Sequence, residues 1–81
     1  NAMTKSQFQL EVYAPGSTDT VLGCWPCAAP IHMAVGDVLR TGAIDPDALP
    51  SAALRVVRVE HGLWLHDGAL AHKLMVFTAL P

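Results

Sequence analysis

The feature that most constrains the fold of this chain is the dipeptide Asp67-Gly68, which separates two long apolar runs. Asp-Gly is a preferred pair for a two-residue hairpin turn, because both turn positions need positive φ. The runs on either side, residues 54–66 and 69–80, are rich in valine, leucine and other strand-forming side chains. We therefore predict one long β-hairpin in the last third of the chain.

A tight turn here also predicts which residues of the two strands face each other. His66 pairs with Ala69, and the pairing continues to Val57 with Thr78. Gly62 could introduce a bulge that shifts the pairing beyond it. Because side chains alternate between the faces of a strand, one face is predicted to be the core face. It contains two histidines among apolar residues: Val57, Val59, His61, Leu63, Leu65, Leu70, His72, Leu74 and Val76.

The opposite face of this hairpin is mixed in character. Glu60 and Lys73 are diagonal neighbours on this face, and we expect them to form a charge pair. If nothing covers this face, its large side chains form an exposed apolar patch, which is typical of an interaction surface or a dimer contact. The predicted interaction residues are Trp64, Met75, Phe77 and Arg58.

The first thirty residues predict a second hairpin. Residues 6–14 alternate between apolar and polar side chains, residues 15–19 have turn composition, and residues 20–24 can return beside the first strand. Pro26 and Pro30 lack a donor N–H, so they exclude regular pairing of a central strand between them.

Residues 31–41 allow two interpretations. Their apolar residues fall on one helical face, with Pro30 before them and Gly42 beyond the end. The same residues also alternate as strands around a Gly36-Asp37 turn, and a glycine inside a helix costs about 1 kcal/mol relative to alanine. We favour strand. Residues 45–49 predict a single helical turn, which Pro50 ends.

These elements predict an all-β domain, a small five- to six-stranded antiparallel barrel with one short helical turn, because closure removes exposed edges. If residues 31–41 are helical, the chain is instead an α+β ubiquitin-like β-grasp. With 81 residues there is room for one small domain, residues 3–81. Asn1-Ala2 before Met3 is typical of an expression-tag remnant.

Composition excludes several classes. The chain is 52% hydrophobic and 15% charged, which excludes intrinsic disorder. No apolar stretch approaches the roughly 20 residues of a membrane span, so we expect no membrane partner. The net charge is −2 and the basic residues are scattered, so we expect no nucleic-acid partner. The chain shows no export signal, and the cytoplasm is the expected location.

Cys24-Trp25-Pro26-Cys27 is a C-x-x-C pair with three interpretations. A thiol-redox centre needs a lowered cysteine pKa, usually supplied by a helix N-terminus. A zinc site could combine the cysteines with histidines, and its candidate ligands are Cys24, Cys27, His32, His61 and His72. In the third interpretation, which we favour, both cysteines are reduced and behave as small apolar side chains.

The chain lacks a nucleophile in recognisable context, a phosphate loop and a dinucleotide fingerprint. We therefore predict a non-catalytic domain for protein–protein interaction or oligomer formation, because so short a chain cannot bury all its apolar residues alone. The expected partner is another protein or a second copy of the chain. No cofactor is expected, apart from zinc in the metal-binding alternative. A thiol-redox protein is the second alternative.

Overall fold

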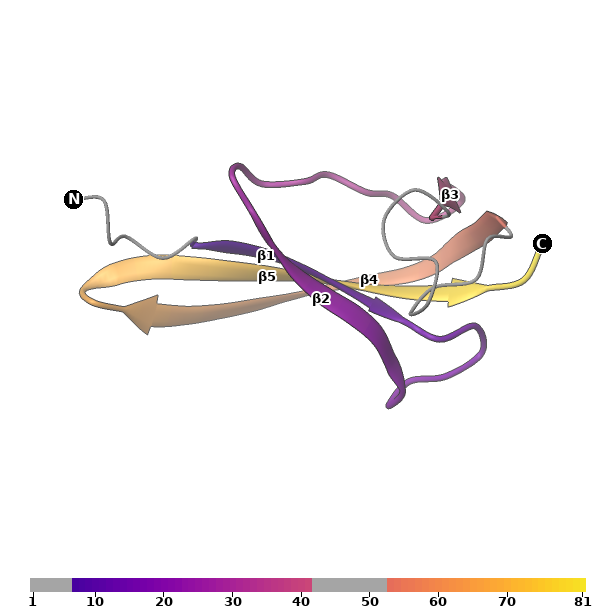
Figure 1. The fold of residues 1–81 in the computed structure, drawn as a ribbon, viewed down its shortest axis with the longest axis horizontal. Helices are drawn as coiled ribbons and strands as arrows, with labels where there is room; N and C mark the ends of the chain where they lie inside the picture. The colour runs from indigo at the N-terminus through magenta and orange to yellow at the C-terminus, as the bar shows by residue number, and fades with distance from the viewer. Residues whose placement is uncertain (1–6, 42–52) are drawn as a thin grey trace.

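The computed structural model describes residues 7–41 and 53–81, which form one curved sheet of five strands (Figure 1). The strands are β1 (Phe8–Tyr13), β2 (Val21–Cys27), β3 (Val38–Arg40), β4 (Ala53–His66) and β5 (Ala69–Ala79). The all-β class is confirmed, since no helix occurs in these two ranges. The helical turn predicted at residues 45–49 and the tag remnant predicted at residues 1–2 lie outside these ranges.

The closed antiparallel barrel is wrong in two respects. The strand order is β2-β1-β5-β4-β3, and the edge strands β2 and β3 do not pair with each other, so the described sheet is an open half-barrel. In addition, β1 and β5 run parallel, with Leu10 opposite Leu74 and Val12 opposite Val76. β1 and β5 are far apart in the sequence, so no local turn in the sequence predicts their pairing.

The long hairpin of β4 and β5 is confirmed. Asp67 and Gly68 have φ values of 51° and 79°, as a two-residue turn of the predicted kind requires. The predicted pairing holds from His66 opposite Ala69 down to Arg58 opposite Phe77. It fails beyond that point, because a bulge between Val56 and Arg58 places Thr78 opposite Val56 rather than Val57. Gly62 lies in regular pairing opposite Lys73.

The predicted hairpin of β1 and β2 is also present. Phe8 lies opposite Cys27, and the pairing runs to Tyr13 opposite Val21 with one irregularity near the turn. Pro26 lies within β2, which is possible because β2 is an edge strand and needs no hydrogen bonds on its outer side. The turn is tied to the last strand, since the Gly16 N–H donates to the Thr78 carbonyl at 2.9 Å.

Residues 31–41 contain no helix, so the β-grasp alternative is wrong. Gly36 has a φ of 99°, and the Asp37 carboxylate accepts the N–H of Ala34 at 2.9 Å, which closes a turn. The Val56 N–H donates to the Asp37 carbonyl at 2.8 Å, which aligns β3 beside β4. The predicted strand after this turn is confirmed as β3, whereas residues 31–35 form a loop.

The hydrophobic core covers one face of the sheet, which we call the inner face. Its centre is formed by Leu10, Val12, Val56, Leu74 and Val76. Partly buried side chains close it from β2, β3, β4 and the loop before β3: Leu22, Trp25, Cys27, Met33, Leu39 and Val59. The opposite face, which carries Glu11 and Phe77, is the outer face.

Candidate functional site

The end of the β4–β5 hairpin projects beyond the rest of the sheet (Figure 1). On β5, pairing with β1 ends at His72, and on β4 the pairing with β3 is confined to residues 53–55. The hairpin from His61 to His72, which we call the arm, is therefore a two-stranded ribbon within the described part of the chain. Large side chains are exposed on both of its faces, Leu63 and Leu65 on the inner one and Trp64 on the outer one, whereas Ala71 is buried.

The inner face of the arm is apolar and exposed. Leu63, Leu65 and Leu70 are 62%, 75% and 59% exposed. They were predicted to lie in the core, together with His61 and Val57, which are also exposed. That part of the prediction is wrong, because β1 pairs with the arm only at His72, β3 does not reach the arm, and Val57 lies at the bulge. Leu74 and Val76 are buried and Val59 is partly buried, as predicted.

Two histidines mark the base of the arm. Nδ1 of His61 lies 2.8 Å from Nε2 of His72, and the rings are stacked with centroids 5.0 Å apart. Because one ring nitrogen must donate and the other accept, a single proton is shared along this contact. The predicted placement of both histidines on one face, diagonal to each other, is confirmed. Their direct hydrogen bond links β4 to β5.

Side chains cover Phe77 on the outer face, where the sequence predicted an exposed apolar patch. Phe77 is 5% exposed, because the ring of Tyr13 stacks on it and the guanidinium of Arg58 lies over it at 4.3 Å. Met75 is half-buried, while Trp64 and Arg58 are exposed. Of the four predicted interaction residues, these last two offer the most surface.

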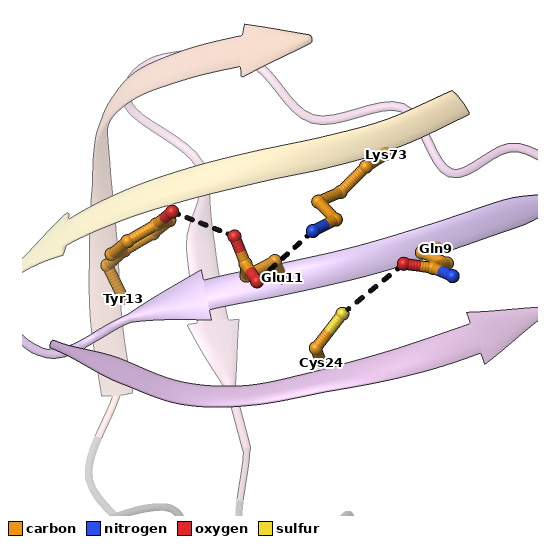
Figure 2. A network of polar contacts seen from close by, with 5 residues as sticks. All are labelled: Gln9, Glu11, Tyr13, Cys24 and Lys73. Atoms are coloured by element: carbon orange, nitrogen blue, oxygen red, sulfur yellow. Dashed lines mark hydrogen bonds and ion pairs between the residues drawn. The ribbon is translucent and has the colours of Figure 1, made fainter. Parts of the chain in front are cut away.

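A polar network covers the middle of the outer face (Figure 2). The Tyr13 hydroxyl donates to a Glu11 carboxylate oxygen at 2.8 Å, and the Lys73 ammonium lies 3.5 Å from the other oxygen. Glu60 forms its ion pair with Arg58, at 2.6 Å. Lys73 and Glu60 are therefore diagonal neighbours, as predicted, but each pairs with a different residue. The hydrogen bond to Glu11 and partial burial raise the pKa of Tyr13.

The two cysteines point to opposite faces of the sheet. Side chains alternate along β2, and Cys27 packs against the inner core, so Cys24 lies on the outer face. Three residues of extended strand separate their Cα atoms by about 10 Å, beyond the reach of a disulfide. Cys24 is exposed, its thiol lies 3.6 Å from the Gln9 side-chain oxygen, and desolvation raises its pKa.

The predicted zinc ligands are not gathered into one site. Within residues 7–41 and 53–81, no three His, Cys, Asp or Glu side chains lie close enough together to hold a metal ion. The structure brings together His61 and His72 alone, and their nitrogens bond each other directly. His32 is exposed in the loop between β2 and β3.

An open groove of about 530 Å³ lies on the outer face beside the arm. Its walls are Gln9, Cys24 and Pro26 on one side and Trp64, His66 and Ala71 on the other. The groove contains the exposed indole of Trp64, the thiol of Cys24 and the imidazole of His66. Among the described residues, Cys24 and His66 form no hydrogen bond with each other. This arrangement has no nucleophile–base pair.

Comparisons with protein-family models, curated proteins and solved structures find no match for this chain. Its described residues include no helix that is long and apolar enough to cross a membrane.

The exposure of the arm leucines was not predicted from the sequence. The leucines were assigned to the core because their alternation with polar residues is the same whether or not another element covers them. The lengths of the strands carry the relevant information. β4 and β5 have 14 and 11 residues, whereas β1, β2 and β3 have 6, 7 and 3, so the shorter strands cannot cover the whole hairpin.

Proposed function

We propose that this chain is a non-catalytic protein-interaction module and that the arm is its contact surface. The observation that supports this most is the exposure of Leu63, Leu65 and Leu70 on one face. An exposed apolar patch of this kind is typical of interaction sites. Full burial of one leucine side chain is worth about 1.5–3 kcal/mol, so contact at three of them supplies several kcal/mol.

The register of the arm keeps Leu63, Leu65 and Leu70 exposed to water. Both strands of the arm are held by the Asp67-Gly68 turn and by the His61–His72 hydrogen bond. A slip of one residue would move the leucines to the outer face but would carry Glu60 and Lys73 to the inner one. A partner surface is therefore the available means of removing them from water.

The test combines light scattering with an apolar-surface dye, over protein concentrations from low micromolar to millimolar. We expect the chain either to associate or, where it is monomeric, to bind the dye. The Leu63→Lys/Leu65→Lys double variant should lose both properties. The control is Val35→Lys, which places the same charge at an exposed loop valine outside the arm.

A strict monomer that binds no dye at any concentration would overturn the proposal. Equal losses in the arm variant and the Val35→Lys control would also overturn it. Circular dichroism confirms that each variant is folded, which is expected because all three side chains are more than half exposed.

A further inference from the structure

The backbone of β4 has a long free edge. One side of β4 pairs with β5 from Arg55 to His66, while the other side pairs with β3 at residues 53–55 and with the turn before β3 at Val56. From residue 57 to residue 66, no described strand pairs with this second side. Unpaired edges of this length are templates for pairing with another chain.

The turn determines which backbone groups of β4 face outward. A two-residue turn closes with a hydrogen-bonded pair, so the N–H and C=O of His66 face β5. These groups alternate along a strand. The outward-facing groups belong to every second residue: Val59, His61, Leu63 and Leu65. Their side chains all lie on the apolar inner face.

We propose that this edge pairs with the same edge of a second copy, antiparallel and around a two-fold axis at Gly62. The proposal rests on the proposed function, because it names the partner of the arm. In this register Val59 lies opposite Leu65 of the second copy, and His61 lies opposite Leu63. All four outward-facing residues then gain a backbone partner, and the interface is self-complementary as a two-fold requires.

Nothing within the monomer requires a glycine at position 62. Its φ is not positive, and an added Cβ would meet Met75 and Lys73 at ordinary contact distances of 3.5 and 3.7 Å. Glycine inside a strand weakens it and often marks close approach by another backbone. The two-fold axis places that approach at Gly62.

The charges on the outer face are compatible with this register. Glu60 lies opposite Trp64 of the second copy and diagonal to His66, while Arg58 lies opposite His66. No carboxylate faces a carboxylate, and the Arg58–Glu60 ion pair within each copy is retained. Like charges directly opposite each other would destabilise the pairing.

The test is site-specific cross-linking in a Cys24→Ser/Cys27→Ser background. Directly opposed residues that are not hydrogen-bonded have Cα atoms about 4.5 Å apart, within the range of a disulfide. The Gly62→Cys chain should therefore form an interchain disulfide under mild oxidation. The control is Glu60→Cys, whose two copies would lie about 13 Å apart along the strands and should remain uncoupled.

Absence of the Gly62→Cys dimer, or equal cross-linking in the control, would overturn the pairing. This failure is distinguishable from failure of the proposed function. If Gly62→Cys stays monomeric while dye binding still depends on Leu63 and Leu65, the arm is a contact surface for a different protein. The space around Gly62 allows the variant to fold, which circular dichroism verifies.

Discussion

The ring of Tyr13 stacks on the ring of Phe77, with centroids 4.3 Å apart and planes inclined by 14°. Tyr13 ends β1 and Phe77 lies near the end of β5, so the stack fastens the only parallel strand pair among the described strands. Arg58 covers the same ring from β4. The outer face is therefore closed by aromatic packing at one end and open at the arm.

Replacing Phe77 with alanine should lower the free energy of unfolding by about 3 kcal/mol, because a buried aromatic ring and its stacking partner are lost. The matched control is Trp64→Ala, at an exposed ring on the same face, which should cost clearly less. Denaturant unfolding at a concentration where the chain is monomeric measures both. Equal losses would contradict the packing described for Phe77.

The titration of Tyr13 tests the polar network. Its hydrogen bond to Glu11 raises the pKa, so the absorbance change of tyrosinate should have its midpoint above the ordinary value of about 10. The chain has one tyrosine, so the signal is unambiguous. A raised pKa favours the protonated form in the folded state. The associated stability is present below about pH 10 and is lost as the pH rises through the folded pKa.

The variant Glu11→Gln removes the negative charge beside the Tyr13 hydroxyl. The midpoint should then move down toward the ordinary value. An unchanged midpoint in this variant would show that Glu11 does not control the titration.

The reactivity of Cys24 tests the environment of its thiol. Because desolvation raises the pKa of this thiol, its rate of alkylation should rise with pH at a midpoint above that of an ordinary cysteine. The measurement uses the Cys27→Ser variant, so that one thiol reacts. A midpoint below the ordinary range would instead favour the thiol-redox alternative.

Gly23 should not tolerate alanine. A Cβ at Gly23 would lie 2.3 Å from the indole of Trp25, which packs against the core, so the ring must move. Such overpacking costs about 1–3 kcal/mol. Unfolding followed by tryptophan fluorescence should show lower stability and altered emission for Gly23→Ala. Gly62→Ala, where space is available, should show neither effect in the monomer.

The β4–β5 hairpin could be predicted from sequence because its determinants are local. The Asp67-Gly68 turn sets the pairing, and alternation then places His61 and His72 on one face. The bulge at Val57 could not be predicted in this way, since valine is a regular strand residue. Gly62, the more obvious position for a bulge, is paired regularly.

The sheet order and the exposed arm needed information that local patterns lack. Pairing of β1 with β5 joins the two ends of the described chain, and no turn residue specifies it. Whether Leu65 is in a core or in water depends on how far neighbouring strands reach, which alternation does not reveal. An exposed apolar patch was therefore expected on the outer face around Phe77, whereas the exposed leucines lie on the inner face of the arm.

Amide hydrogen exchange along β4 distinguishes a free edge from a paired one, because amides that face β5 alternate in this strand with amides that face away from it. Arg58, Glu60 and Trp64 should be protected at every protein concentration by their pairing with β5. Val59, His61, Leu63 and Leu65 should exchange fast in dilute solution and slowly in concentrated solution, as the edges of two copies pair. Fast exchange of these four amides at every concentration, with their neighbours protected, would contradict the account.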